Sequence, residues 1–409
     1  MRQLRNDRHR LPLRPQQSGI ALMAMLTLLT LLGLYVFVGQ LSTTQFLTAR
    51  ALETTDALAQ GRDALIADAI AQPSISDAGY LRLPDLGVDG FGVAAEGGGA
   101  SANFAGNGQD RSVIGKLPWK TLTSGPLRSQ GECLWYVVAG RFQNGVKTAV
   151  FNWDTQGQID VIDGNGAVVA SNLAALVVAP GRSLGGQARD LADAAYRQCG
   201  GNYDARNYLD TFDNANALSG EVNYFAGSTN NRVASGNNNK RFVMAETDFY
   251  NDRLVFITAA DIFDPLIRRS DFSGEITSLL DNAVFQAHLQ AIAVTGSKGT
   301  DNLLCNQAPN RAFCTNWKEM LFLTQLPAPA PISIDGAPSG NCSRVLIFAG
   351  RRGAGQSRND GVERANKNNY LENPNLASFN VPTAAAANFS GVSVFDYRTP
   401  ATDVVRCLP

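Results

Sequence analysis

The candidate catalytic residues are few, because the chain of 409 residues contains only two histidines, His9 and His288. His9 lies in the basic N-terminal segment, so a Ser-His-Asp or Cys-His site would have to use His288 as its general base. No G-x-S-x-G or other nucleophile signature accompanies this histidine. The apolar residues around it (SGEITSLLDNAVFQAHLQAIAV) have helical spacing, which favours a histidine on a helix surface or packed beside it. We therefore expect no catalytic residues and no enzymatic activity.

Two glycine-rich loops share the pattern G-R-x-x-x-G-Q-x-R, one from Gly181 to Arg189 and one from Gly350 to Arg358. A phosphate-binding loop would need G-x-x-x-x-G-K-[ST] or G-x-G-x-x-G, and neither loop has that spacing. We expect turns in which the glutamine and arginine side chains bond to neighbouring backbone.

Two pairs of carboxylates are candidate calcium ligands, Asp85 with Asp89 and Asp160 with Asp163. The chain contains no D-x-[DN]-x-[DN]-G loop, so turn formation is the favoured interpretation. A zinc site is disfavoured because the cysteines have no C-x₂-C spacing and histidine is scarce. We expect no metal and no other cofactor.

All six cysteines lie between residues 133 and 407. They are Cys133, Cys199, Cys305, Cys314, Cys342 and Cys407. An even number in an extracytoplasmic region predicts disulfides, although six cysteines allow 15 complete pairings. Proximity in the sequence favours Cys305 with Cys314. A Cys342–Cys407 bond would tie down the C-terminus and leave Cys133 with Cys199, and buried free thiols remain the alternative.

The region that must position these residues begins with an uncharged apolar segment, IALMAMLTLLTLLGLYVFVGQL, from Ile20 to Leu41. A membrane-spanning helix needs about 20 such residues. Five arginines precede the segment and only Asp7 opposes them. By the positive-inside rule the N-terminus stays in the cytoplasm, and everything after Leu41 lies outside.

The helical pattern continues beyond the apolar segment, because no proline occurs between Ile20 and Pro73. We expect one helix over residues 20–71, roughly 75 Å long at about 1.5 Å per residue. Its outer half is polar with one apolar stripe. The stripe consists of Phe46, Leu47, Leu52, Leu58, Leu65, Ile66 and Ile70.

Such a helix resembles the N-terminal helix of type IV pilins and pseudopilins. A basic leader, residues 1–19, ends in Gln17-Ser18-Gly19, and Ile20 opens the apolar run. The resemblance implies that a prepilin peptidase cuts between Gly19 and Ile20. Most pilins carry glutamate at the fifth mature position, where this chain has Ala24. The Gly-x-Ala-Leu opening without glutamate is more similar to minor pilins of the PilX type and to K-type pseudopilins. A plain uncleaved anchor with a helical stalk is the alternative.

Charge gives no indication of a nucleic-acid partner. The whole chain has a formal charge of −1, and the leader alone carries +4, so the mature chain carries about −5. A mildly acidic ectodomain lacks the basic surface that nucleic-acid binding needs. The 44% hydrophobic and 17% charged residues fit a globular protein with a large core.

After the helix, short apolar runs joined by tight turns predict antiparallel β-structure. Strands are expected at residues 133–139, 147–152, 158–162, 167–170, 173–179, 241–246, 253–258, 344–348 and 391–395. The strands at 241–246 and 253–258 are expected to pair with each other. Helices are expected at residues 187–198, 261–269, 273–294 and 316–325, and a proline-rich extended connection at 326–340.

The two glycine-rich loops also suggest an internal repeat. Asn207-Tyr208 after the first loop matches Asn369-Tyr370 after the second. We predict an α+β fold in which the long N-terminal helix, transmembrane and then amphipathic, packs on an antiparallel β-sheet. An elaborated C-terminal α+β region would contain a duplicated strand-loop-strand unit.

The expected domain organisation follows from these elements. It comprises a leader (1–19), a pilin-like helix (20–71, transmembrane over 20–41), a β-rich head (72–259), a helical insertion with the proline-rich connection (260–341) and a C-terminal β region (342–409).

The predicted function is that of a structural minor pilin or pseudopilin subunit of a type IV pilus or type II secretion filament, which is located at the filament tip, presents a large ectodomain and is not an enzyme. Its expected partners are other pilin or pseudopilin subunits, the prepilin peptidase and inner-membrane lipid. The alternative is a single-pass periplasmic binding or adhesive protein that never polymerises.

Overall fold

The computed structural model describes residues 18–87, 96–100, 112–145, 147, 150–189, 198–199, 201–203, 205–210, 240–294 and 305–409. The chain divides into two compact units, residues 1–53 and 54–409. The predicted α+β class is confirmed, since an apolar N-terminal helix is followed by antiparallel sheets. The leader up to Gln17 lies outside the described residues.

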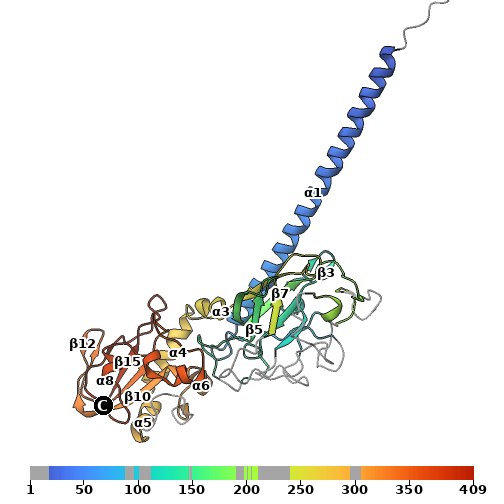
Figure 1. Ribbon diagram of the computed structural model, residues 1–409. Helices are drawn as coiled ribbons and strands as arrows, with labels where there is room; N and C mark the ends of the chain where they lie inside the picture. Colours follow the sequence, from blue (N-terminus) through green and yellow to red (C-terminus); the bar gives the residue numbers. More distant parts are fainter. Residues whose placement is uncertain are drawn as a thin grey trace, which may run out of the picture. The chain divides into compact units, whose positions relative to one another are not determined.

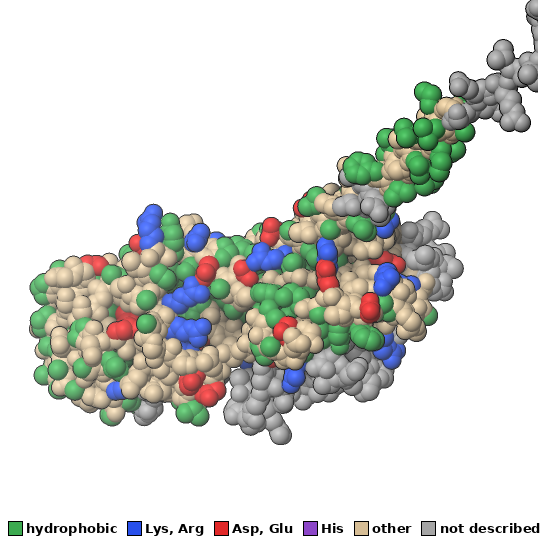
Figure 2. All heavy atoms as spheres, turned by 45° about the horizontal axis from the view of Figure 1, so that its top comes forward, with side chains coloured by type: hydrophobic (Ala, Val, Ile, Leu, Met, Phe, Trp, Pro, Cys, Tyr) green, Lys and Arg blue, Asp and Glu red, His purple; other side chains and the backbone are tan. Residues whose placement is uncertain are grey.

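Helix α1 (Ser18–Ile70) is a single helix of 53 residues. In the first unit its apolar segment, Gly19–Gly39, has a mean hydropathy of 2.4 and none of it is buried. Figure 2 shows hydrophobic side chains covering this part of the helix. Water would solvate such a surface poorly, so a lipid-like environment suits it better.

The second unit begins inside α1, where the burial pattern changes. Thr54, Ala57, Leu58, Gly61, Leu65 and Ala69 are buried. They recur every three or four residues, so they form one face of the helix. Gly61 allows a close approach to the sheet, because a Cβ at this position would lie 3.3 Å from Cγ1 of Val177. Of the predicted stripe, Leu58 and Leu65 are buried, whereas Phe46, Leu47 and Leu52 are exposed.

The first sheet has four antiparallel strands in the order β1-β4-β7-β9. They are β1 (Val113–Lys116), β4 (Trp135–Val138), β7 (Ala175–Ala179) and β9 (Arg253–Ile257). The inner strands β4 and β7 are buried along their whole length. Beside this sheet are a hairpin of β2 (Arg128–Ser129) and β3 (Glu132–Cys133), and a small three-stranded sheet. The latter has the order β6-β5-β8, from β5 (Ile159–Ile162), β6 (Val168–Leu173) and β8 (Lys240–Val243).

A helical segment follows β9. Helix α3 (Ala259–Leu266) begins with a capping box, in which Thr258 and Asp261 each accept from the other's backbone N–H. It leads into α4 (Ser270–Asp281), α5 (Ala283–Ala291) and α6 (Arg311–Trp317). Three further short helices are α2 (Trp119–Leu122), α7 (Gly361–Ala365) and α8 (Asn375–Ser378).

The second sheet is antiparallel, with the order β10-β13-β15. Its strands are β10 (Leu321–Ala330), β13 (Cys342–Phe348) and β15 (Val404–Leu408), and Figure 1 shows β10 and β15 in the same region as α4 and α6. A small sheet of β12 (Ala337–Pro338), β11 (Ser333–Ile334) and β14 (Ser390–Gly391) adjoins it. One continuous hydrophobic core contains residues of both main sheets and of α3 to α6.

Several expectations are wrong. The predicted helix at 316–325 is replaced by the end of α6, a 3₁₀ turn (Lys318–Met320) and β10. The run from Leu321 pairs with β13, and this pairing overrides the helical spacing. The predicted helix at 273–294 is broken at Asn282, whose side chain caps α5 by accepting from Phe285 N.

The expected pairing of 241–246 with 253–258 is also wrong. Instead β8 pairs in parallel with β5, and β9 pairs with β7. The expected strand at 147–152 is not formed by its described residues, because Asn152 closes a turn with Asp154 and Thr155. In the expected strand at 391–395 only Gly391 belongs to β14. The expected helix at 187–198 lies mostly outside the described residues.

Candidate functional site

The predicted cleavage and membrane residues lie in the first unit. Gly19, Ile20 and Ala24 belong to α1, and the side chains of Ile20 and Ala24 are exposed. A Cβ added at Gly19 would meet nothing within 4 Å. In the part of the chain that the structure describes, α1 is the one helix long and apolar enough to cross a membrane. An apolar helix near the N-terminus fits a membrane anchor or a signal sequence.

The three disulfides join Cys133 to Cys199, Cys305 to Cys314 and Cys342 to Cys407. These are the pairs that the sequence favoured, and disulfides fit an oxidising, extracytoplasmic compartment. Cys133, Cys199, Cys305, Cys314 and Cys342 are buried, whereas Cys407 is only partly buried. All six cysteines are oxidised, so none of them presents a thiolate nucleophile.

The candidate acid-base and metal-binding residues are dispersed. His288 lies on α5, partly buried, and Asp163 accepts from the backbone of its own turn, at Asn165 and Ala167. Asp160 accepts from Asn172 N, and Asp89 lies outside the described residues. Among the described residues no three His, Cys, Asp or Glu side chains gather in a group that could hold a metal ion.

Asp85 is fully buried and organises two glycine turns. Its carboxylate accepts from the backbone of Gly87 and Gly97 and from the hydroxyl of Tyr203. Burial raises its pKa, which these hydrogen bonds and the charge of Lys116 oppose. Lys116 is itself buried, which lowers its pKa to about 8, and its Nζ lies 4.3 Å from the ring centroid of Tyr203. Asp85 therefore holds the turns at Gly87 and Gly97 in place, with Lys116 as its nearby positive charge.

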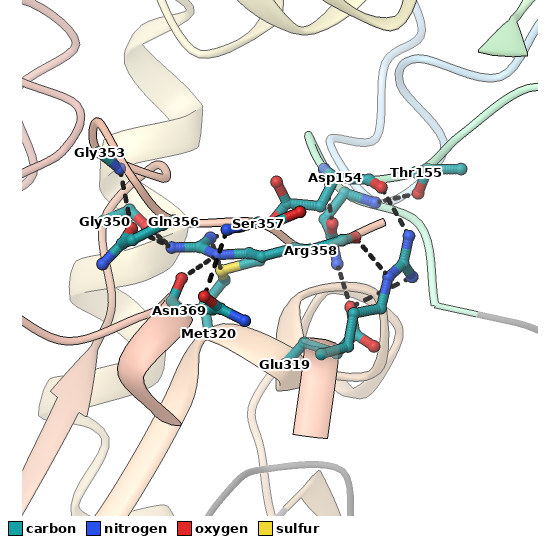
Figure 3. A network of polar contacts seen from close by, with 12 residues as sticks. Asp154, Thr155, Glu319, Met320, Gly350, Gly353, Gln356, Ser357, Arg358 and Asn369 are labelled. Carbon is teal, nitrogen blue, oxygen red and sulfur yellow. Dashed lines mark hydrogen bonds and ion pairs between the residues drawn. The ribbon is translucent and has the colours of Figure 1, made fainter. Parts of the chain in front are cut away.

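The two glycine-rich loops form the same local structure. In the first loop, Gly181 N donates to Asp252 and the Arg189 guanidinium donates to Gly181 O, Gln187 Oε1 and Asn207 O. In the second loop, the equivalent bonds run from Gly350 N to Asp403 and from Arg358 to Gly350 O, Gln356 Oε1 and Asn369 O. Figure 3 shows the second loop.

Further contacts match. The glutamine accepts from Leu184 N in the first loop and from Gly353 N in the second. Each arginine also lies over a tyrosine ring, Arg189 at 5.2 Å from Tyr208 and Arg358 at 4.0 Å from Tyr370. The glutamine and arginine side chains therefore bond to groups of the protein itself. These hydrogen bonds occupy the side-chain atoms that would otherwise bind a phosphate.

The loops differ in the acid that faces the arginine. Arg358 Nη1 lies 2.9 Å from Asp154 Oδ2, with side-chain exposures of 0% and 2%. Arg364 joins this network, donating to Asp154 O and lying 3.6 Å from Glu319. Arg189 has a more distant acid, Glu132, at 3.8 Å. Asp154 comes from the chain beside the first sheet, so this ion pair joins the two sheet regions.

An aromatic cluster surrounds the same junction. Residues 151–156, which we term the clasp loop, lie in the connection from β4 to β5. They place Trp153 among four aromatic rings of the C-terminal region. Its ring centroid lies 4.8–6.4 Å from those of Phe272, Trp317, Phe348 and Phe395. Gln156 also donates to Asn359 at 2.8 Å. The clasp loop therefore joins the two sheet regions through a buried ion pair and aromatic packing.

The last turns of α1 are held by arginines. Arg62 donates to Phe256 O on β9 and forms an ion pair with Asp261 at 2.6 Å. Arg269 donates to Ile70 O and Gln72 O at the end of α1. A cation here satisfies free carbonyls and the negative end of the helix dipole, although α1 has no basic residue in its own last turn.

Sequence reasoning missed the clasp loop, Arg269 and the two aspartates that precede β9 and β15. Asp252 could have been noticed, because it comes directly before the strand expected at 253–258, whereas no strand was expected after Asp403. No comparable signal links Asp154 to Arg358, which lie 204 residues apart in the chain.

Comparison with known proteins gave no match to a family model, to a curated protein or to a solved structure.

Proposed function

We propose that this chain is a structural minor pilin or pseudopilin subunit, of a type IV pilus or a type II secretion filament. The observation that carries the proposal is the unbroken helix α1. Its segment Gly19–Gly39 is apolar and exposed, and its final turns bury one face every three or four residues. One rod that serves as a membrane helix and then as the first core element of an ectodomain is the design that the resemblance to pilins implies.

The proposed mechanism has no catalytic step. A prepilin peptidase removes the leader after Gly19, and residues 20–41 hold the subunit in the inner membrane with its ectodomain outside. During assembly the apolar helix leaves the bilayer for a bundle of similar helices, where apolar side chains of neighbouring subunits replace lipid. The exposed apolar surface of this segment supports that exchange, because both environments exclude water.

We further propose that α1 packs on the first sheet as in a pilin head, and that the second sheet is its duplicate. The close approach of Gly61 to Val177 supports the packing. The duplication is supported by the shared strand orders β4-β7-β9 and β10-β13-β15, and by the matched bonds of Arg189 and Arg358. In each region the central strand leads into the arginine loop, and the loop's first glycine bonds an aspartate before the outer strand.

Ala24 supports a position at the filament tip. The new N-terminal ammonium of each subunit would be costly in an apolar bundle without a partner charge. The resemblance implies that a glutamate at the fifth mature position neutralises such an ammonium on a neighbour. Alanine supplies no carboxylate, so this subunit would be tolerated best where one side has no neighbour to serve. The large second unit, residues 54–409, would also clash least at an end.

N-terminal sequencing tests the proposal, in cells that contain a prepilin peptidase. The mature wild-type protein should begin at Ile20, and Gly19→Leu should leave the full-length form in the membrane. Gly33→Leu is the matched control, because Gly33 lies in the same helix and a Cβ there also meets nothing within 4 Å. A wild-type protein that still begins at Met1 would contradict the proposal and favour a non-polymerising periplasmic binding or adhesive protein with an uncleaved anchor.

A further inference from the structure

Two carboxyl groups meet at the start of strand β9. Asp252, which is 4% exposed, accepts from Gly181 N at 2.8 Å through Oδ1 and from Asp210 N at 2.7 Å through Oδ2. Asp210, which is partly buried, accepts from Asn251 N at 2.9 Å and from Asp252 N at 3.3 Å. Each aspartate therefore accepts from the backbone of the other. This reciprocal pair ties the end of residues 205–210, which we term the 205–210 segment, to the turn before β9.

The pair requires a proton. A side-chain hydrogen bond joins the two carboxyl groups, and an ionised carboxylate can only accept, so one of the two must supply an O–H. Burial, followed by the effect of Asp210, raises the pKa of Asp252 well above its usual value, whereas the backbone N–H groups of Gly181 and Asp210 lower it. Because like charges in contact disfavour ionisation of both groups, the proton belongs to the pair.

The cations nearest in the chain have other partners. The guanidinium of Arg189 donates to Gly181 O and Asn207 O. Arg253, which follows Asp252, forms an ion pair with Glu246 at 2.8 Å. Solvent screens charges at the surface, so burial and the second carboxyl group are the main influences on the proton. Strand β7 carries no charged residue, and the other charged or titratable side chains of the surrounding elements are Arg182, Arg206 and Asp248, all exposed, together with Tyr208 and Tyr250.

The second loop has a different arrangement at the same place. Asp403 bonds the first glycine of that loop, and its other oxygen accepts from Asn375 Nδ2 at 2.8 Å. An amide donor stabilises an ionised carboxylate, so this contact survives the loss of a proton. The residue that matches Asp210 in the repeat is Glu372, which accepts from Gln356 Nε2 at 2.7 Å. One aspartate is therefore enough to hold such a loop, and the second carboxyl group is particular to the first loop.

We propose that Asp210 and Asp252 form a proton-dependent latch, which holds the 205–210 segment against the start of β9 and opens when the pair loses its proton. With the proton in place, the two carboxyl groups bond to each other. Without it, two adjacent anions repel at a buried position, and water reaches them only when the end of the segment moves away. Arg189 keeps its bonds to Asn207 O and Tyr208 O, so the opening is confined to the end of the segment.

The latch closes toward acid pH and opens toward alkaline pH. Because the pKa of Asp252 is raised in the folded state, the stabilisation is complete below the usual aspartate pKa of about 4. It is lost as the pH rises through the raised value. The second loop should not open in this way, because Asn375 still donates to Asp403 when that carboxyl group is ionised.

Hydrogen exchange of the full chain in detergent, resolved to single residues by fragmentation, tests the proposal. The reporters are the backbone amides of Asp210, Asn251 and Asp252. After correction for the intrinsic exchange rate, their protection should fall by at least about tenfold between about pH 5 and 9, because each unit of pKa shift changes the opening equilibrium about tenfold. The amide of Ser390, which donates to Asn375 in the second sheet region, should keep its protection.

The most informative variant is Asp210→Asn, because it places an amide beside Asp252 as Asn375 lies beside Asp403. The protection of its reporter amides should lose most of the pH dependence. Asp252→Asn is a second variant that leaves a single carboxyl group. Asp248→Asn is the matched control, since Asp248 is an exposed aspartate that precedes the same strand, and it should behave as the wild-type protein does.

Three results would overturn the proposal. The first is constant protection of the reporter amides from about pH 5 to 9. The second is a pH dependence that both Asp210→Asn and Asp252→Asn retain. The third is an equal loss of protection throughout the second unit, which would indicate global unfolding instead of a local opening. The wild-type profile is decisive by itself if neither variant folds. The latch does not depend on filament assembly, so these results leave the proposed function unaffected.

Discussion

Replacing Asp154 by asparagine should destabilise the second unit strongly. Asp154 Oδ2 lies 2.9 Å from Arg358 Nη1, and the two side chains are 2% and 0% exposed. The substitution keeps the size of the side chain but removes its charge. Arg358 would then remain buried, with carbonyl groups and the amide oxygen of Gln356 as its acceptors. Breaking a buried ion pair from one side typically costs about 3–5 kcal/mol.

An exposed ion pair serves as the control. Arg253 and Glu246 lie 2.8 Å apart, with side-chain exposures of 40% and 69%. Solvent screens such a pair, so Glu246→Gln should cost only about 0–1 kcal/mol. The double replacement Asp154→Leu with Arg358→Met removes both buried charges. It should cost less than the sum of the two single replacements, because neither charge is left unpaired.

Urea unfolding of the full chain in detergent, followed by tryptophan fluorescence, measures these effects. Trp153 is adjacent to Asp154 and packs against Trp317 at 4.8 Å, so the emission reports on the junction. The free energy of unfolding should fall by at least about 2 kcal/mol more for Asp154→Asn than for Glu246→Gln. Equal losses, or single and double replacements that simply add, would refute the argument that the buried pair stabilises the junction.

Further predictions concern pH, the end of α1, the disulfides and the filament. Burial raises the pKa of Asp403 to about 7, so between about pH 4 and 7 this carboxyl keeps its proton in the folded state but loses it in the unfolded state. The free energy of unfolding should therefore fall by up to about 4 kcal/mol as the pH rises through this range. Denaturation across this range should show a shallower decline for Asp403→Asn, and an unchanged pH profile would contradict the assignment. Arg269→Ala should cost about 1–2 kcal/mol by leaving the carbonyl of Ile70 without its cation, whereas Arg268→Ala should cost little. Alkylation before reduction should label no cysteine, and six labelled thiols would exclude the three disulfides. Mild reductant should reduce the Cys342–Cys407 disulfide first, because the other two disulfides are buried. Immunogold should label one filament end in few copies, and regular labelling along the shaft would count against the argument from Ala24.

Some of the local structure could be predicted because it depends on neighbouring residues. The long helix follows from an apolar run, helical spacing and the absence of proline before Pro73, and α1 ends at Ile70. The hairpin from β5 to β6 follows from the Asp-Gly-Asn-Gly turn, where Asp163 bonds the backbone of Asn165. The shared G-R-x-x-x-G-Q-x-R pattern indicated the inward bonding of Gln187 and Gln356 for the same reason.

The sequence could not determine which distant segments meet. Residues 316–325 have helical spacing, yet β10 begins at Leu321 because it completes a sheet with β13. Adjacent runs such as β8 and β9 suggested a hairpin, but each finds more buried pairing in a different sheet. Local propensity amounts to tenths of a kcal/mol per residue, and burial in a sheet outweighs it.

The junction is the clearest case of what only the tertiary structure decides. A buried arginine needs an acid and several acceptors within hydrogen-bond distance, but any of the chain's carboxylates could meet that need. The fold selects Asp154 because the clasp loop places Trp153 in an aromatic pocket, which brings the next residue beside Arg358. The sequence therefore determined the apolar N-terminal helix, much of the antiparallel β-structure and the paired glycine loops, whereas only the packing of distant segments determined how the two sheet regions are joined.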